Sequence, residues 1–182
     1  GDVVINDLTI VAKGDRAVNI INQASTVTLD NVTASAKNNA VMVATSAAGA
    51  KLTVNDSDLT GLAVVNVAAP NADVVINDTN ITNVDANANE NYGAISTFKT
   101  ATGATVVVNG GKVVVADDSA AAFNATADSS IVFNGTDGEI TIITAVAYIG
   151  DAGYETLEEA LKDVKDGQTI TLNADITASE II

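Results

Sequence analysis

One short phrase recurs along the chain and limits what the chain can fold into. Each copy has alternating apolar residues, then Asn or Asp at a turn, and then a second short apolar segment, as in Val3-Val4-Ile5-Asn6 followed by Leu8-Thr9. The turn residue advances by 24, 25, 22, 32 and 25 positions between copies. Strand-like segments that repeat at this period indicate a solenoid, in which each turn of the chain buries the next. Six positions carry the turn residue: Asn6, Asp30, Asn55, Asn77, Asn109 and Asn134.

Within each phrase the apolar residues alternate with period two, which is the period of a β-strand. We therefore expect Val3 and Ile5 to face the core and Val4 to face outward. A second short strand follows the turn and carries one inward apolar residue. The other inward pairs of the first strand are Val27/Leu29, Leu52/Val54, Val74/Ile76, Val106/Val108 and Ile131/Phe133. The inward residues of the second strand are expected to be Leu8, Val32, Leu59, Ile81 and Val113.

A third apolar segment lies between successive phrases, for example Ala17-Val18-Asn19-Ile20 and Ala63-Val64-Val65-Asn66. Three strand-like sides per turn, stacked at roughly 4.8 Å, would form three parallel sheets. An antiparallel sandwich also offers short strands at this spacing, but it explains neither the repeated phrase nor the scarcity of hairpin turns. The sequence therefore predicts an all-β fold over residues 1–146, a right-handed parallel β-helix solenoid with three strands per turn. The hand follows from the usual right-handed crossover between parallel strands.

The charge balance excludes several classes of partner. The chain has 23 acidic and 8 basic residues, a net charge of −15, and Arg16 is its single arginine. Such a charge repels nucleic acid and anionic bilayers, because both are bound through clusters of Lys and Arg. Cys and His are absent, so zinc sites, catalytic thiols and histidine bases are excluded. No apolar run is long enough to span a bilayer, and we expect neither nucleic-acid binding nor membrane insertion.

The composition changes after Val146, and one short amphipathic α-helix is expected near the C-terminus. Thr156 and Glu159 have the spacing of a capping box, and Gly167 marks the end of a helix of about 11 residues. A strand resumes at Thr169. Residues 147–182 are therefore predicted to be a helix-containing segment that either caps the solenoid or opens the first turn of a following one. The apolar face of the helix consists of Leu157, Ala160, Leu161 and Val164.

Part of this C-terminal segment has a recognisable pattern. Three stretches carry it: Ala147-Tyr148-Ile149-Gly150, Tyr154-Glu155-Thr156-Leu157-Glu158-Glu159-Ala160-Leu161, and Asp166-Gly167-Gln168-Thr169-Ile170-Thr171-Leu172. Together they resemble the entry segment of pectate-lyase-like parallel β-helices, in particular those of large repeat-bearing surface proteins and adhesins of bacteria and archaea. Residues 1–146 match that family by pattern alone. The resemblance implies an extracellular, cell-surface location, secreted or attached to the cell wall, and it carries over no active site.

The β-helix family includes polysaccharide lyases and hydrolases, so catalysis has to be weighed. A lyase needs a basic residue beside calcium-binding acids, and a hydrolase needs facing carboxylates. The acidic candidates are the adjacent Asp117 and Asp118 and the corner residues Asp56 and Asp58. None has an Arg or a His nearby in the sequence, and no Trp offers a platform for sugar stacking. The preference of Asp for turns explains why these acidic residues are present. We therefore expect no catalytic residues and no enzyme.

The candidate ligand site lies in the insertion that lengthens one repeat to 32 residues. Loops on a rigid scaffold are where binding residues usually lie. The D-x-N-x-N run fits a loose calcium site at Asp85, Asn87 and Asn89, although an EF-hand loop would need Gly and Glu where Glu90 and Ser96 stand. A solvated polar loop is the alternative, and no cofactor other than calcium is expected. The residues predicted to contact a ligand are Asp85, Asn87, Asn89, Glu90, Asn91 and Tyr92.

Outward positions raise two further hypotheses. A series of Thr residues could form an ice-binding face, but Val114 interrupts it, and cross-strand stacking of β-branched residues is the alternative. Four outward Val residues suggest an apolar strip that makes a lateral contact or lies under neighbouring loops. The Thr series is Thr9, Thr33, Thr60, Thr82, Thr141 and Thr177, and the Val residues are Val4, Val75, Val107 and Val132.

Together these features favour a non-catalytic structural or adhesive module of a microbial cell-surface protein, which acts as a stalk or as a binding scaffold. The expected partners are a host or microbial surface glycan or protein, and the neighbouring domains of a longer chain, since the sequence begins at Gly1 directly in a strand. A carbohydrate-binding or carbohydrate-processing β-helix is the alternative. Two carboxylates about 5–9.5 Å apart in a cleft would favour a hydrolase, and an unbroken ladder face would favour a scaffold.

Overall fold

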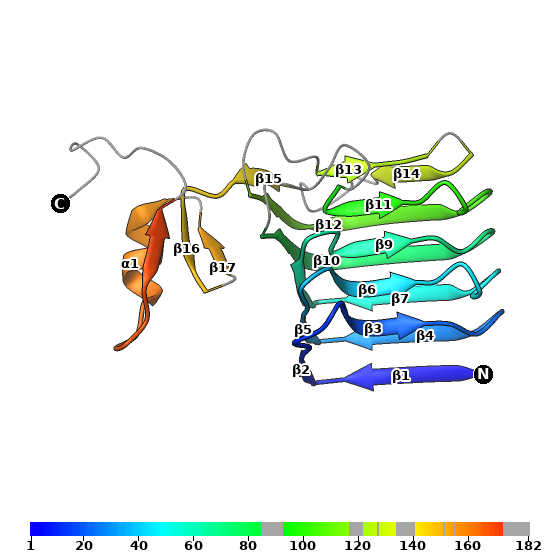
Figure 1. The fold of residues 1–182 in the computed structure, drawn as a ribbon, viewed down its shortest axis with the longest axis horizontal. Coiled ribbons are helices and arrows are strands. Elements are labelled where there is room, and N and C mark those ends of the chain that lie inside the picture. Colours follow the sequence, from blue (N-terminus) through cyan, green and yellow to red (C-terminus); the bar gives the residue numbers. More distant parts are fainter. Residues whose placement is uncertain are drawn as a thin grey trace.

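The computed structural model shows a stack of coils with a small helix-containing unit beside it (Figure 1). It describes residues 1–84, 93–116, 122–126, 128–133, 141–150, 152–154 and 156–172. Within these residues the chain winds through about five parallel turns. We call strands β1–β15 the coil stack, and we call β16–β18 together with α1 the helix unit.

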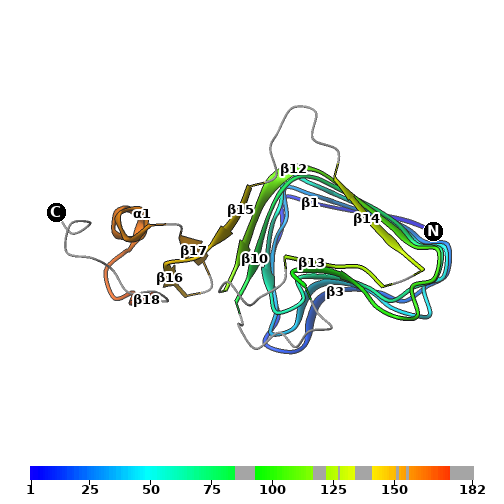
Figure 2. The ribbon, with the colours of Figure 1, turned by 90° about the horizontal axis from the view of Figure 1, so that it is seen from above.

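Each turn of the coil stack contributes strands to three columns that run along the stack like the sides of a prism (Figure 2). The first column contains β1 (Asp2–Asn6), β4 (Thr26–Asp30), β7 (Lys51–Asn55) and β14 (Ser130–Phe133). The second contains β2 (Thr9–Val11), β5 (Thr33–Ser35), β8 (Asp58–Gly61) and β15 (Thr141–Thr144). The third contains β3 (Arg16–Ile20), β6 (Asn39–Val43), β9 (Val65–Val67), β11 (Ile95–Thr97) and β13 (Phe123–Asn124). The long strands β10 (Asp73–Asn83) and β12 (Thr105–Val115) each span the first and second columns.

Neighbouring strands in every column are parallel, and equivalent residues of successive turns lie side by side. Val3 pairs with Val27, Val27 pairs with Leu52, and Leu52 pairs with Val74. No hairpin joins consecutive strands in the described coil stack, so the antiparallel sandwich is rejected. The path of the chain in Figures 1 and 2 advances as a right-handed helix, which confirms the predicted hand.

The described columns form two sheets, whereas three were expected. β10 and β12 continue through the corner between the first and second columns, so these two columns merge into one sheet of ten strands. The third column forms a sheet of five strands. The corner is passed at Asp78 in β10 and at Gly110 and Gly111 in β12, all of which have a positive φ angle. A local change of this kind bends a strand while its pairing continues on both sides.

The turn predicted at each Asn or Asp is made by the residue that follows it. Asp7, Asn31, Asp56 and Asp78 have φ angles of 51°, 52°, 45° and 44°. Asn and Asp tolerate this left-handed region better than most residues, because their short polar side chains bond to nearby groups. A polar pair, such as Asn6-Asp7 or Asn77-Asp78, therefore gives the first four turns the same corner, and Gly110 takes the corresponding position in β12.

Side-chain amides connect these corners along the stack. Asn77 Nδ2 donates to Asn55 Oδ1 at 2.8 Å, and Asn109 Nδ2 donates to Asn77 Oδ1 at 2.7 Å. One residue further along each turn, Asn31 Nδ2 donates to Asp7 Oδ1 at 2.6 Å. We call the first set the amide ladder. It joins residues in the same register as the backbone pairing, so it stabilises the alignment of successive turns.

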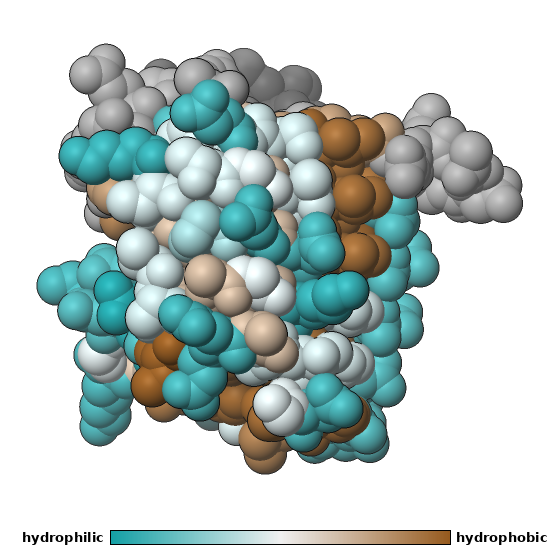
Figure 3. Space-filling view, turned by 90° about the vertical axis from the view of Figure 1, so that its right-hand side faces the viewer, coloured by the Kyte–Doolittle hydropathy of each residue, from teal (hydrophilic) through white to brown (hydrophobic). Residues whose placement is uncertain are grey.

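The predicted inward residues of the first column form a continuous aliphatic core. Leu52, Val74 and Val106 are almost fully buried. The two ends differ from this. In the last described turn Phe133, predicted to face inward, is 42% exposed. In the first turn β1 has a neighbouring strand on one side only. Val3 is 50% exposed, whereas Leu52, two turns further on, is 1% exposed. Figure 3 shows apolar surface along the lower edge of the molecule, at this N-terminal end of the stack.

The prediction for the second column was right for Val32, which is fully buried, and wrong for Leu8, which is 48% exposed. The register adds a further difference. Leu59 pairs with Ala34, and Ala34 pairs with Ile10. Ile10 and Ala34 therefore take the position that the sequence assigned to Leu8 and Val32. Residues two apart face the same side of a strand, so the alternation alone could not choose between them. A constant offset from the turn residue identifies the correct set, because Ile10, Ala34, Leu59, Ile81 and Val113 each lie four positions after it.

The outward Thr series is not one row of equivalent positions. Thr33 pairs with Asp58, whereas Thr60 lies two residues further along β8 and pairs with Ser35. Thr177 lies outside the described residues. The described second column therefore has no flat array of Thr, which an ice-binding face would need.

The outward Val residues do form one row in the first column. Val75 pairs with Val107, and Val107 pairs with Val132. Thr28 and Thr53 continue the row towards the first turn. Figure 3 shows an apolar strip along the upper part of the stack, on the side of this column. Val4 pairs with Thr28 and completes the row. All six side chains are β-branched, so they pack well against each other across the strands.

The helix unit contains a small antiparallel sheet and one helix. β16 (Ala147–Ile149) pairs with β17 (Ala152–Tyr154) and with β18 (Ile170–Leu172), and α1 (Leu157–Asp163) packs on them. The unit lies beside the second column (Figures 1 and 2). The contact is close, because a Cβ at Gly153 would lie 2.8 Å from Val114 Cγ1. The division at residue 146, and the role of this segment as a cap or an entry segment, stay predictions.

α1 begins where the sequence predicts and has 7 residues. The Thr156 side chain is the N-cap and accepts a hydrogen bond from the Glu159 N–H at 3.2 Å. This bond is one half of the predicted capping box. Among the described residues no helix is long and apolar enough to cross a membrane.

The C-terminal end of α1 and its apolar face differ from the prediction. The helix ends at Val164, whose ψ angle of 132° is extended, before the predicted end at Gly167. A separate turn follows, in which the Lys165 N–H donates to Gln168 Oε1 at 2.8 Å. Because this turn takes the place of the last helical turn, the helix is shorter than predicted. Leu161 was expected on the buried face, but it is 54% exposed.

Candidate functional site

A groove of about 310 Å³ lies on the outer face of the third column. Strands β3, β6 and β9 and the connections next to them contribute its lining. We call it the outer groove. The residues that line it include Arg16, Asn39, Met42, Leu62, Asn66 and Phe98.

The floor of the outer groove follows from the alternation of side chains in the third column. Val41 and Val65 belong to the core, so their neighbours Met42 and Asn66 point outward. Met42 pairs with Asn66, and Asn66 pairs with Ser96 on the next strand. One outward side chain per turn is therefore aligned along the stack, at the usual strand spacing of roughly 4.8 Å.

Two polar atoms of this outward row are buried without a hydrogen-bond partner among the described residues. Asn66 is 7% exposed and Ser96 is 1% exposed, and both Asn66 Oδ1 and Ser96 Oγ are unpaired. Asn39 differs, since its Nδ2 donates to the Ala63 carbonyl at 2.6 Å. An unpaired buried polar atom costs roughly 1–3 kcal/mol, so a water or a ligand group is expected to complete it.

An aromatic ring and one cation also line the outer groove. Phe98 contributes the ring, and Lys99 Nζ lies 5.8 Å from the centre of that ring. Arg16, at the start of β3, contributes the cation. The described lining contains no carboxylate, although the protein as a whole is strongly acidic. Of the two unpaired residues, Asn66 lines the groove and Ser96 does not. The groove thus combines apolar contacts with an unpaired hydrogen-bond acceptor, which is the usual composition of a binding site.

A second hollow of about 500 Å³ lies between the second column and the helix unit. Asp58 and Lys112 line it from the coil stack, and Tyr154 and Asp163 line it from the helix unit. Burial and the neighbouring Asp163 carboxylate raise the pKa of Tyr154 above its ordinary value. None of the unpaired buried atoms in the described residues lines this hollow. It therefore lacks the feature that distinguishes the outer groove.

The ligand residues predicted from the sequence lie outside the described residues, and so does the proposed calcium site at Asp85, Asn87 and Asn89. Asp117 and Asp118 also lie outside them. In the part of the chain that the structure describes, no group of three or more His, Cys, Asp or Glu side chains could hold a metal ion. The loop residues that stay predictions are Asp85, Asn87, Asn89, Glu90, Asn91 and Tyr92.

The two acidic residues of the described corner, Asp56 and Asp58, make contacts that stabilise the turn and connect successive turns. Asp56 occupies the left-handed corner position, and its backbone N–H donates to the Asn77 carbonyl at 3.1 Å. Asp58 Oδ1 accepts a hydrogen bond from Asn80 Nδ2 at 2.8 Å. Both acids therefore have a structural role in the corner.

The outer groove was not predicted from the sequence. Asn66 belongs to the third apolar segment, which indicated a strand and nothing more, and Ser96 was considered only as a calcium ligand position. The available signal was a polar residue at the outward position of an otherwise apolar strand, as at Asn19, Asn66 and Asn124. Phe98 gave no signal, because it lies outside the repeated segments.

Comparisons with known proteins give no relative of this chain. No family model matches it, and neither a curated protein nor a solved structure is significantly similar to it. The fold therefore defines the class of protein by itself: a parallel β-helix solenoid of about five turns.

Proposed function

We propose that this chain is a non-catalytic module of a microbial cell-surface protein, in which a stiff solenoid acts as a stalk or as a binding scaffold. The unbroken stacking of the turns carries the proposal. β4, β7, β10 and β12 are each paired with a neighbouring strand on both sides. They lie over one continuous cluster of buried aliphatic residues.

Stiffness follows from the direction of the strand pairing. The backbone hydrogen bonds between turns run along the stack, so bending the module strains several strand pairs at once. The net charge of −15 favours solubility and opposes association between exposed sheet edges. The cell-surface location, outside the cell and secreted or wall-attached, is supported by the resemblance of the C-terminal segment to pectate-lyase-like entry segments of surface proteins and adhesins.

A distance measurement between two spin labels tests the stiffness. The chain has no Cys, so Asp2→Cys and Ser130→Cys would give unique labelling sites at the two ends of the first column. These residues are separated by five strand spacings, or about 24 Å along the stack. Pulsed electron spin resonance should give one narrow distance distribution near this value. A broad distribution would contradict the role as a stalk.

Incubation with plant and bacterial polysaccharides tests the non-catalytic character. We expect no new reducing ends, which a hydrolase would release, and no unsaturated product, which a lyase would release. Release of either product by the purified chain would overturn the proposal.

Carbohydrate binding is the second candidate function, and the outer groove favours it. An aromatic ring together with an unpaired polar atom can hold both the apolar face and the hydroxyl groups of a sugar. No described side chain of the groove is suited to act as a general acid or base, so the proposal extends to binding and not to processing. A glycan array with and without calcium would test it. Binding lost on deletion of residues 85–92 would assign the site to that loop.

A further inference from the structure

We propose that the outer groove binds a neutral linear glycan that lies along the stack, and that Asn66 forms hydrogen bonds with its hydroxyl groups. The inference rests on carbohydrate binding as the function of the groove. It goes further, because it specifies the charge of the ligand, its direction and the residues that select it.

The unpaired atom in the groove selects the polar group of the ligand. Asn66 Oδ1 is an acceptor and needs a donor. A hydroxyl group satisfies it, because a hydroxyl donates one hydrogen bond. An ionised carboxylate only accepts, so it would meet Asn66 Oδ1 as one acceptor against another. Asn66 therefore favours hydroxyl groups over the carboxylates of a uronate.

The charge of the protein favours the same class of ligand. A net charge of −15 repels an acidic polymer during its approach. Arg16 is the one arginine of the chain, and one exposed cation offsets little of that repulsion. A neutral glycan avoids this cost.

The register of the strands gives the direction of the ligand. Asn66 lies opposite Met42 on the adjacent strand, roughly 4.8 Å away along the stack, and both residues line the groove. An extended chain of pyranose rings advances by about one strand spacing per ring, so successive rings can lie against successive turns. An extended peptide advances by roughly 3.3 Å per residue and its side chains alternate in direction, so it does not match the turns.

Met42 and Phe98 supply the apolar contacts of the site. Both line the groove and both are partly exposed. Sugar rings have apolar C–H faces, which pack on an aromatic ring or on a thioether. The volume of about 310 Å³ lies at the small end of the usual range for ligand pockets, so it suits a short stretch of a chain.

Isothermal titration calorimetry with defined oligosaccharides tests the inference. Neutral β-linked glucose, xylose and mannose oligomers of increasing length, and galacturonate oligomers of equal lengths, are titrated into the whole chain with calcium and with EDTA. For at least one neutral series we expect the affinity to rise with length and to level off once the groove is filled. The galacturonates should bind at least tenfold more weakly, and EDTA should change neither result.

Two variants connect the binding to the groove. Asn66→Ala should lower the affinity at least tenfold, yet it should leave the unfolding midpoint unchanged or slightly raised, because the removed oxygen has no partner to lose. Asn19→Ala is the matched control, since Asn19 lies in the same outward row and is exposed outside the groove lining. It should bind like the unchanged protein.

The outcomes separate this inference from the proposed function. If galacturonates or an extended peptide bind more tightly than neutral glycans, and Asn66→Ala weakens that binding, the ligand is not a neutral glycan. The groove would still be a ligand site. If neutral glycan binding survives Asn66→Ala but is lost on deletion of residues 85–92, the groove is not the binding site. Carbohydrate binding would still be the function. Absence of binding by every ligand at millimolar concentration would overturn both the neutral glycan and carbohydrate binding, and a water would then be the partner of Asn66 Oδ1.

Discussion

The coil stack and the helix unit bury their residues in different ways. The stack has one cluster of buried aliphatic residues that extends from Ile20 to Val115. The cluster of the helix unit contains three buried residues among those described: Ala147, Ile149 and Ala160. Its strands form an antiparallel sheet of three, whereas the middle strands of the stack have a parallel neighbour on both sides.

The difference shows how stability is distributed in this molecule. In the stack each turn is buried by the next, so stability accumulates along the repeat. A unit as small as the helix unit buries little by itself and depends on its contact with the stack, where Gly153 packs on Val114. The same substitution should therefore have a larger effect in the stack than in the helix unit.

The glycines Gly111 and Gly167 should show the largest contrast. Both have a positive φ angle, of 98° and 81°. A Cβ at Gly111 would overlap the backbone of Thr79, whereas a Cβ at Gly167 has open space around it. We expect Gly111→Ala to lower the free energy of unfolding by more than ~3 kcal/mol, and Gly167→Ala by about 1–2 kcal/mol from backbone strain alone. Urea unfolding measures both. Equal losses would show that the corner of β12 relaxes easily.

A matched pair of leucines should show the next largest contrast. Leu52 is 1% exposed in the core of the stack, and Leu161 lies on the outer side of α1. Leu52→Ala should cost about 2–5 kcal/mol, because it removes buried methyl groups and leaves a cavity. Leu161→Ala should cost less than ~0.5 kcal/mol. A comparable loss at both positions, measured by urea unfolding, would mean that Leu161 is covered in solution.

Leu161 also shows where prediction from the sequence fails. Its spacing placed it on one face with Ala160, which is fully buried. The periodicity identifies residues that share a face, but it does not tell how wide the covering surface is. In the helix unit three short strands cover Ala160 and leave Leu161 exposed. The early end of the helix has a similar origin, because the turn at Lys165 and Gln168 competes with helical bonds that the pattern alone favoured.

The coil stack was predicted more successfully, because the repeat tests each position several times. The inward residues of the first column recur in every turn, and Leu52, Val74 and Val106 are all buried as predicted. In the first turns of the second column, the prediction chose residues two positions before those that pair with Leu59. Two apolar residues with the same orientation follow the corner there, so the alternation could not choose between them. The unpaired atoms of Asn66 and Ser96 could not be predicted, since a missing partner is visible only when neighbouring turns are placed together.

Side-chain hydrogen bonds give the third comparison. Asn77 donates to Asn55 and accepts from Asn109 in the amide ladder, so Asn77→Ala should cost about 1–2 kcal/mol in the stability of the stack. Thr156 accepts one bond at the start of α1, so Thr156→Ala should cost about 1 kcal/mol, confined to the helix unit. Hydrogen exchange measured by NMR can separate the two regions. Loss of protection in the stack for Thr156→Ala would show that the helix unit also stabilises the stack, which contradicts an effect confined to the helix unit.

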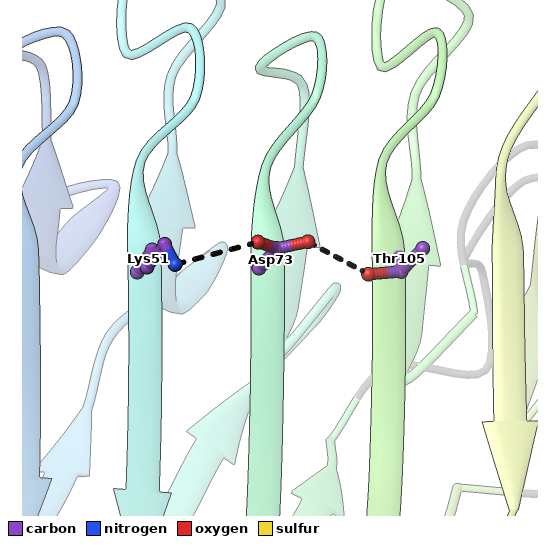
Figure 4. Close-up of polar contacts among 3 residues, drawn as sticks. All are labelled: Lys51, Asp73 and Thr105. Atoms are coloured by element: carbon purple, nitrogen blue, oxygen red, sulfur yellow. Dashed lines mark hydrogen bonds and ion pairs between the residues drawn. The ribbon is translucent and has the colours of Figure 1, made fainter.

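Exposed ion pairs should show the smallest effects. Lys51 Nζ lies 4.0 Å from Asp73 Oδ2, and Asp73 Oδ1 accepts a hydrogen bond from Thr105 Oγ1 at 3.1 Å (Figure 4). Because both charged side chains are largely exposed, Lys51→Ala should change the free energy of unfolding by less than ~0.5 kcal/mol, and salt should reduce this further. A larger loss that persists in high salt would show that the aliphatic stem of Lys51 packs on the sheet and contributes more than its charge.

The corresponding pair in the helix unit joins Lys162 Nζ to Glu158 Oε1 at 2.8 Å, one helical turn apart. The hydrogen bond from Lys162 and its positive charge lower the pKa of Glu158, and the same contact raises the pKa of Lys162. The contribution of Glu158 is therefore present above the ordinary glutamate pKa and is lost as the pH falls through the lowered value. An NMR titration of the Glu158 carboxyl group should show this lowered pKa, and Lys162→Ala should return it to the ordinary range. If the pKa of Glu158 stayed the same in the variant, the pair would not form in solution and would contribute nothing to the helix unit.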